Sequence, residues 1–294
     1  MRSALLLGLL WATPALAARV VVVQSDDLEP YTEPVKAFVD ALDEPAVLLN
    51  LHGRRAEAAA VQARLVKEAP DVVFALGAKA AWTARQALPD TPVVYASVLD
   101  PARYGIDDAG VTGIAATVPP AQYLSQFVGF FPDVKAIGVL RGPLATEERV
   151  EEMRRAATFL GLDLVVREAD SPRSARKSFN TMAPDVDALW LQPDREMLTA
   201  DLFRVLTEES RRQRLPLLVE TDNMVRAGAL FAVVPDPEGL GTQAAAIVQR
   251  ILAGEPSSGE VPAEVLVVLN ISTVKAAQIP FDTLLLDFVD VIVE

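Results

Sequence analysis

Residues 75–82, ALGAKAAW, follow an apolar run and combine residue types that hold anions in many α/β proteins. Gly77 can adopt backbone angles that other residues avoid, and the small side chain of Ala78 lets a ligand approach the first helical turn. The N–H groups of such a turn have no partner inside the helix, so they can bind a negatively charged group. Gly77 and Ala78 are therefore candidate ligand contacts, although Gly77 could serve only as a tight strand–helix turn.

This stretch does not match the usual nucleotide-binding motifs. Both GxGxxG and GxxxxGK[ST] need several glycines at fixed spacing, whereas Gly77 stands alone. The adjacent Lys79 is either a ligand contact or a solvated lysine of the first turn. The segment does not indicate nucleotide binding.

Polar residues follow several other apolar runs at the same point. Each of them alone reads as a helix N-cap, because Asp, Asn and Ser accept hydrogen bonds from free N–H groups. Their repetition at the ends of successive strands favours a shared binding edge, since ligands gather at the carboxyl ends of parallel strands. The residues concerned are Ser25, Asp26, Asp27, Ser97, Asp100, Arg141, Gln192, Asp194, Glu220, Asp222 and Asn223.

Aromatic side chains are available near these strand ends. Tyr31 and Tyr104 lie in polar loops, where a large ring has little structural reason to be, so Tyr31 is a candidate ligand contact. Trp82 follows Gly77 inside a helical pattern, and we expect it in the core.

The composition favours binding over catalysis. The chain has no cysteine and a single histidine, His52, which we interpret as an ordinary loop residue. Disulfides, thiolate metal sites and cysteine nucleophiles are therefore absent from the sequence. No catalytic residue, metal site or cofactor is predicted. A carboxylate pair drawn from Asp100, Asp194 and Glu220 would suit a glycosidase, and an exported hydrolase stays open as the least favoured alternative.

The charge balance excludes nucleic acid as a partner. The formal net charge is −13, and such a chain repels polyanions unless it carries a local basic patch. The pairs Arg54-Arg55, Arg154-Arg155 and Arg211-Arg212 lie in helical patterns beside glutamates, which is typical of solvated helix faces.

Residues 1–17, MRSALLLGLLWATPALA, are typical of a cleaved secretory signal peptide, with one basic residue, a short apolar core and a small-x-small ending. An uncleaved membrane anchor is the alternative, but the apolar part is too short to span a bilayer. We expect a mature chain that begins at Ala18 and is exported to the periplasm.

Short β-branched runs alternate with amphipathic stretches along the rest of the chain, which predicts an α/β fold. Several runs are apolar at every position, so both faces of each sheet should be covered by helices. The alternation breaks at a turn-rich segment, 99–110, followed by an extended connector, 111–120, which suggests two Rossmann-like lobes with parallel sheets. We expect residues 18–117 and 235–294 in the first lobe and 118–234 in the second. The predicted strands are 20–23, 47–51, 71–75, 93–96, 136–140, 163–166, 188–191, 217–219, 230–234 and 265–269.

Ten short motifs in order along the chain resemble the ABC transporter substrate-binding family whose members handle tryptophan or tyrosine. Examples are PDVV at 70–73, PVVYASVLDP at 92–101, and FFPDVKAIGVLRGP at 130–143. Further matches are GVTG at 110–113, GLDL at 161–164, DALWLQPD at 187–194, ILAGE at 251–255 and VLNISTVKAAQI at 268–279.

The resemblance implies a type I periplasmic binding protein fold that closes around a small, amino-acid-like solute at a hinge. It implies pocket positions at Gly77, Ala78, Ser97, Asp100, Asp194 and Asp222. The family's Tyr-Asn-Pro is replaced here by Arg141-Gly-Pro143, so Arg141 is a further candidate, for a carboxylate, or else a surface arginine. We expect helix N-termini at Ala78 and near Pro143 to hold the negative end of the ligand.

The implied partners are a membrane permease and its ATPase subunit, with the binding protein itself a monomer. A periplasmic sensor that signals to a membrane partner uses the same closure and stays open as the alternative.

Overall fold

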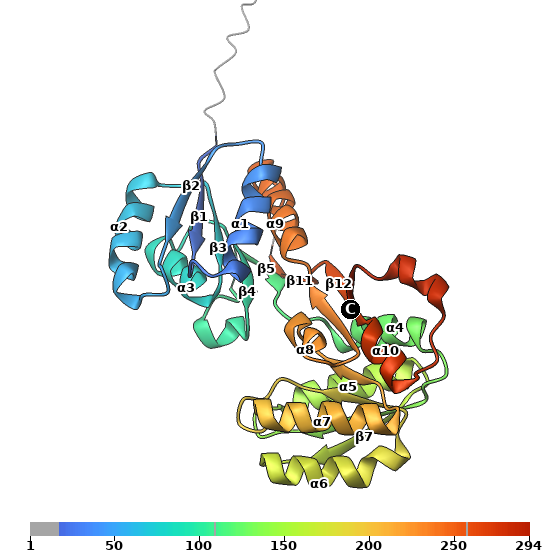
Figure 1. Cartoon of the computed structure of the whole chain (residues 1–294). Coiled ribbons are helices and arrows are strands. Elements are labelled where there is room, and N and C mark those ends of the chain that lie inside the picture. The colour runs from blue at the N-terminus through green and yellow to red at the C-terminus, as the bar shows by residue number, and fades with distance from the viewer. Residues whose placement is uncertain (1–17, 109, 257) are drawn as a thin grey trace, which may run out of the picture.

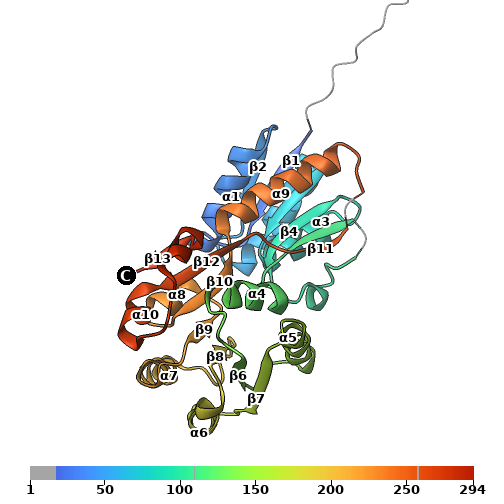
Figure 2. The ribbon, with the colours of Figure 1, turned by 90° about the vertical axis from the view of Figure 1, so that its right-hand side faces the viewer.

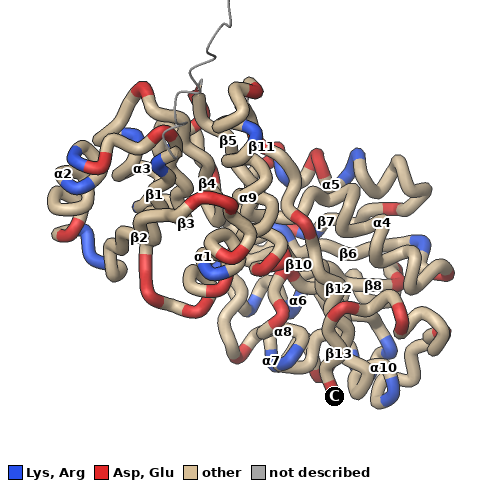
Figure 3. The backbone as a smooth tube through the Cα atoms, turned by 90° about the horizontal axis from the view of Figure 1, so that it is seen from above, with Lys and Arg blue, Asp and Glu red and all other residues tan. Residues whose placement is uncertain are grey.

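The computed structural model describes residues 18–108, 110–256 and 258–294, so the predicted signal peptide lies outside the described residues. The described chain forms two α/β lobes, each built on its own sheet, as Figure 1 shows. Acidic residues are spread over both lobes (Figure 3). No helix of this part of the chain is long and apolar enough to cross a membrane.

The sheet of the first lobe has six strands in the order β11-β5-β4-β3-β1-β2, and every pair in it is parallel. Helices α1 and α9 cover one face, and α2 and α3 cover the other. The elements are β1 (Val20–Gln24), α1 (Glu29–Ala41), β2 (Ala46–Asn50), η1 (Arg55–Glu57), α2 (Ala58–Glu68), β3 (Val72–Leu76), α3 (Ala78–Ala87), β4 (Val93–Val98), η2 (Pro101–Tyr104), β5 (Val111–Ala115), α9 (Pro237–Leu252) and β11 (Gly259–Val261).

The sheet of the second lobe has seven strands in the order β13-β12-β10-β9-β8-β6-β7. Its helices again lie on both faces, with α6, α7 and α8 opposite α4, α5 and α10 (Figure 2). The elements are α4 (Pro120–Phe130), β6 (Ala136–Arg141), α5 (Glu147–Phe159), β7 (Asp163–Glu168), α6 (Pro172–Met182), η3 (Ala183–Asp185), β8 (Ala188–Leu191), α7 (Ala200–Gln213), β9 (Leu217–Val219), α8 (Asp222–Arg226), β10 (Phe231–Pro235), β12 (Val265–Asn270), α10 (Ile271–Ala277), η4 (Thr283–Phe288) and β13 (Val291–Val293).

Uniformly apolar strands explain why both sheets are covered on both faces. Strand β1 reads VVVVQ and is buried at every position, as are β3 and β8. Alternate residues of β1 enter separate clusters, Val20 and Val22 on one face and Val21 and Val23 on the other. Burial of both faces excludes water from the sheet, which is the main stabilising contribution.

The chain passes between the lobes three times, and these passages orient the two sheets. It leaves the first lobe after β5, returns after β10, and leaves again after β11. The carboxyl ends of β5 and β10 therefore face the opposite lobe, and the parallel strands beside them end at the same edge. The two edges that carry strand-end loops thus face each other.

The assignment of residues 235–294 to the first lobe is corrected in part. Helix α9 and strand β11 belong to the first lobe, but β12 and β13 join the second sheet. Strand β12 enters that sheet from the first lobe, so it runs away from the interlobe edge and pairs antiparallel with β10, Val265 opposite Pro235. The connector expected at 111–120 begins as β5, a full strand of the first sheet.

Gly241 lies where α9 packs closely against α1. A Cβ atom at Gly241 would lie 2.3 Å from the carbonyl oxygen of Pro34 and 2.7 Å from the Ala37 Cβ. We expect Gly241→Ala to lower the free energy of unfolding by about 1–3 kcal/mol, because two helix backbones would have to separate. Denaturant unfolding would measure this change.

Gly129 in α4 supplies the matched control, because a Cβ atom there meets nothing within 4 Å. Gly129→Ala should be neutral or stabilising by roughly 0.5–1 kcal/mol, since alanine restricts the unfolded chain and favours helix. An equal loss of stability in both variants would show that the close approach of α1 and α9 is not the cause.

Candidate functional site

A pocket of about 480 Å³ opens at the carboxyl edge of the first sheet, the edge that faces the second lobe. Its walls come from the segments that follow β1, β2 and β3, together with α1 and η2. The lining residues are Ser25, Asp26, Tyr31, Leu51, Arg54, Arg55, Ala58, Ala78, Lys79, Trp82, Thr83 and Tyr104.

Gly77 shapes the floor of this pocket. It has a φ of +89° and precedes α3, and a Cβ atom there would lie 2.6 Å from Ser25 Oγ and 2.8 Å from Tyr31 Cε1. Ser25 Oγ in turn accepts a hydrogen bond of 3.0 Å from the N–H of Ala80. The N–H groups of Ala78 and Lys79 precede the first complete turn, so the helix offers them no acceptor. Absence of a side chain at Gly77 therefore brings Ser25, Tyr31 and the start of α3 together.

The pocket carries charges of both signs. Lys79 Nζ donates to the carbonyl oxygen of Gly53 at 2.8 Å, and Arg54 pairs with Glu57 at 2.9 Å. The exposed guanidinium of Arg55 makes no ion pair with any described residue. Asp26 supplies the negative charge of the pocket lining, as a carboxylate. The cations outnumber the acid, so a ligand with one carboxylate and one ammonium group suits this wall.

Three aromatic side chains complete the pocket. Tyr31 from α1, Trp82 from α3 and Tyr104 from η2 all line it. Trp82 is 37% exposed, so the expectation that it lies in the core is wrong. It occupies the fifth position of α3, on the face turned toward the pocket and away from the sheet.

The opposite edge, in the second lobe, holds a half-buried ion pair. Glu220 follows β9, and its Oε1 lies 3.3 Å from Arg149 Nη2 of α5. Burial raises the pKa of Glu220, and the Arg149 guanidinium and the Gln192 amide partly oppose that shift. Glu220 was identified from the sequence as a strand-end residue. Its partner could not be predicted, since Arg149 lies 71 positions away.

Replacing this carboxylate should change how stability depends on pH. A raised pKa means that the contribution of Glu220 to the free energy of unfolding is full below about 4.5 and falls as pH rises through its folded-state pKa. The difference in unfolding free energy, wild type minus Glu220→Gln, should therefore decrease as pH rises from 4.5. Chemical denaturation across this range measures it. A difference that grows with pH would mean that the Arg149 ion pair outweighs burial.

Of the eight expected contact residues, Tyr31 and Ala78 line the pocket, Gly77 packs behind Ser25 and Tyr31, and the other five lie elsewhere. Ser97 lies at the bulge of β4 with a φ of +57°, and Asp100, with a φ of +53°, caps η2 by accepting from the N–H of Arg103. Asp222 is half-buried and pairs with Arg226 at 3.4 Å, one turn along α8. For Asp100 the helix-cap interpretation is the one the structure bears out.

Arg141 and Asp194 have partners within the second lobe. Arg141 Nη1 lies 2.7 Å from Glu147 and 3.3 Å from Glu168. Asp194 is 4% exposed and accepts hydrogen bonds from the backbone N–H groups of three residues, Leu144, Glu196 and Met197. Both of its carboxylate oxygens are therefore hydrogen-bonded within the second lobe.

The helix expected to begin near Pro143 is α5. Helix α5 starts at Glu147 after the N-cap Thr146, and both Glu147 and Glu148 lie in its first turn. These carboxylates already interact favourably with the helix dipole, so this terminus would repel an anionic group. Within the described ranges, no group of three or more His, Cys, Asp or Glu side chains could hold a metal ion.

Comparison with known proteins supports a single family. The family model for the ABC transporter substrate binding protein matches residues 42–287. A tyrosine-binding protein of Clostridioides difficile is 20% identical over 228 residues, which cover 74% of this chain and 65% of that protein, so the match falls short of two thirds of its length.

Solved structures show the same fold. The ligand-free, open structure of CD0873, a substrate-binding protein with adhesive properties from Clostridium difficile, superposes with a TM-score of 0.77 at 18% identity, covering 90% of this chain and 96% of that one. A domain from Streptococcus pneumonia in complex with L-Trp gives a TM-score of 0.60 at 22% identity, covering 95% and 100%. These structures confirm the two-lobed type I periplasmic binding protein fold, and the family match over most of the chain shows that it belongs to the ABC transporter substrate-binding proteins.

Proposed function

We propose that this protein captures an aromatic amino acid between its lobes and delivers it to a membrane permease driven by an ATPase. The observation that carries the proposal is the composition of the first-lobe pocket, which combines unpaired cationic charge, the Asp26 carboxylate and three aromatic rings. A zwitterion with an aromatic side chain matches all three features.

Each part of such a ligand has a candidate partner. The α-carboxylate is held by Arg55 and by the N–H groups that begin α3, with the Lys79 charge nearby. The ammonium group is held by Asp26, and the ring lies against Trp82, Tyr31 or Tyr104. Tyrosine and tryptophan are named as ligands of two similar proteins, which supports this class of ligand.

Closure of the lobes would complete the site. The strand-end edges face each other, and the three passages between the lobes form a hinge. The chain superposes better on an open, ligand-free relative than on an L-Trp complex, which supports an open starting state. On closure Glu220 and Gln192 would reach the ligand from the second lobe.

Export to the periplasm, a monomeric state and the permease belong to the same proposal. The family match favours transport over a signalling sensor. It also argues against an exported hydrolase, because members of such a family bind their ligand without converting it.

Thermal unfolding tests the proposal directly. The chain from Ala18 onward would be stripped of co-purified ligand by unfolding and refolding, then scanned with tyrosine, tryptophan, phenylalanine and non-aromatic amino acids. A ligand at about 100 times its Kd should add roughly 2.7 kcal/mol and raise the midpoint by several degrees. The proposal predicts a saturable shift with aromatic amino acids only. A shift with sugars or dicarboxylates alone, or turnover of any ligand, would contradict it.

A further inference from the structure

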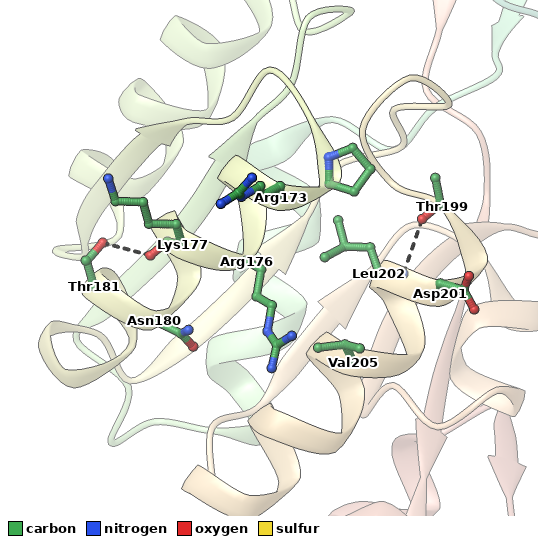
Figure 4. A pocket seen from close by; sticks show the side chains of 10 residues that line it. Arg173, Arg176, Lys177, Asn180, Thr181, Thr199, Asp201, Leu202 and Val205 are labelled. Carbon is green, nitrogen blue, oxygen red and sulfur yellow. Dashed lines mark hydrogen bonds between the residues drawn. The ribbon is translucent and has the colours of Figure 1, made fainter.

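A second groove, of about 690 Å³, lies on the second lobe between helices α6 and α7. Residues Arg173, Arg176, Lys177, Asn180 and Thr181 form its α6 wall, and Thr199, Asp201, Leu202 and Val205 form its α7 wall, with Pro172 at one end. Figure 4 shows Arg176 projecting between the two helices, with Asn180 on its own helix and Val205 opposite. We name this surface the α6–α7 groove.

The cations of this groove have no counter-charge of their own. Arg173, Arg176 and Lys177 are exposed, and none of them forms an ion pair with a described residue. Helix α6 carries these three basic residues and no acidic one, in a chain with 40 acidic and 27 basic residues. Asp201 on the opposite wall supplies one negative charge, so the groove remains net positive.

The placement of these charges is unfavourable for the isolated helix. Arg173 lies in the first turn of α6, where the helix dipole repels cations. Arg173 also lies three positions from Arg176 and four from Lys177, so like charges are neighbours on one helix surface. The capping box of Ser171 and Ser174, with Asp170 accepting from both hydroxyl groups, stabilises the helix start nonetheless. An anionic group in the groove would relieve this repulsion.

The form of the groove favours a polypeptide over a small ion. Sites for small ligands bury most of the ligand surface, whereas the cations and Asn180 here remain exposed. Leu202 and Val205 add an apolar floor beside the cations, and the Thr199 hydroxyl and the Asn180 amide add hydrogen-bonding groups. An extended acidic segment with occasional apolar residues uses all of these features.

The groove also has a defined position relative to the cleft. Helices α6 and α7 follow β7 and β8, so both begin at the sheet edge that faces the first lobe. We infer that the α6–α7 groove docks an acidic polypeptide segment of a protein partner, at the rim of the interlobe cleft. This surface is separate from the proposed amino-acid site, because both of its walls belong to the second lobe.

Fluorescence anisotropy with a labelled peptide tests the docking surface. The probe is a short peptide of glutamate and alanine with two leucines, and glutamine replaces glutamate in the comparison peptide. At about 150 mM salt, attraction between exposed charges more than a Debye length apart is screened, so only direct charge contacts in the groove contribute to binding. The acidic peptide should therefore bind, and the glutamine peptide should not. Equal binding of the two peptides, or binding of neither, would overturn the inference.

Charge reversal locates the binding surface. The triple variant Arg173→Glu, Arg176→Glu and Lys177→Glu should weaken binding of the acidic peptide by roughly tenfold or more, the loss expected for three exposed ion pairs. The control is Lys67→Glu, Arg250→Glu and Lys275→Glu, which changes net charge equally at exposed cations without ion pairs on α2, α9 and α10. Equal weakening in both triple variants would overturn the groove as the site.

Two further probes separate other sources of negative charge. Inorganic phosphate that displaces the peptide at low concentration, or vesicles of phosphatidylglycerol that bind the wild type but not the groove variant, would reassign the surface to a free anion or to a membrane. Thermal shifts with aromatic amino acids should be the same in the groove variant and the wild type. Failure of the amino-acid proposal would therefore leave the peptide titration unaffected, and the reverse also holds.

Discussion

Replacement of Asp194 by alanine is expected to lower the free energy of unfolding by about 3–5 kcal/mol, with a fall in the thermal midpoint of roughly 10 °C. The buried carboxylate accepts three backbone hydrogen bonds, from the N–H groups of Leu144, Glu196 and Met197 at 2.9–3.1 Å. Alanine would leave these donors without an acceptor, and hydrogen bonds to a charged group are the stronger ones. Thermal and denaturant unfolding would measure the loss.

Asp222→Ala supplies the control for this prediction. Asp222 also follows a strand of the second lobe, but its side chain is 46% exposed and pairs with Arg226 at the surface. Its removal should change stability by less than about 0.5 kcal/mol. If Asp194→Ala instead folds normally and only ligand affinity falls, then Asp194 contacts the ligand, and the closely bonded loop seen here rearranges on binding.

Replacement of Trp82 by alanine is expected to weaken binding of the aromatic ligand by roughly 30-fold or more, and to lower the free energy of unfolding of the ligand-free protein by about 1–3 kcal/mol. Trp82 is 37% exposed and lines the pocket, so part of its surface is free to contact a ligand while the rest packs against the first lobe. A bound aromatic ring would pack against the exposed part of Trp82, and both surfaces would be removed from water. Isothermal titration calorimetry with the ligand found by the thermal screen measures the change.

Phe159→Ala is the matched control for Trp82. Phe159 is an aromatic residue that is 86% exposed on α5 of the second lobe, outside the first-lobe pocket. Its removal should leave ligand affinity within about twofold. Unchanged affinity in Trp82→Ala would show that the ligand does not use this pocket.

Continuous apolar runs made most of the fold predictable. Residues 188–191 and 217–219 are strands with the predicted bounds, because every position in them is apolar and buried. Strands β11 and β13, which are absent from the predicted strands, have only three residues each. Such elements depend on neighbouring strands and helices that a local pattern does not contain.

The candidate site was predicted less completely than the fold. The sequence pointed to this edge of the first sheet through Gly77 and Ala78, because a glycine between a strand and a helix marks a tight turn that can be recognised from neighbouring residues alone. Trp82 was expected in the core because its helical spacing is compatible with either face, and only packing decides which face meets the sheet. Asp100 and Asp194 were candidates by position, but caps and ligand contacts use the same residue types.

The sequence by itself determined the α/β class, the two lobes, the family and the lack of cysteine chemistry, because each depends on residue type and order along the chain. Only the tertiary structure decided which strand ends share a pocket, that β12 and β13 belong to the second lobe, and that Arg149 meets Glu220. These contacts bring together residues that are far apart in the sequence, from 25 to 104 in the pocket and 149 with 220 in the ion pair. A local sequence pattern contains no information on the distance between such residues. Charge without a partner, as on α6, is likewise visible only when every neighbour is in place.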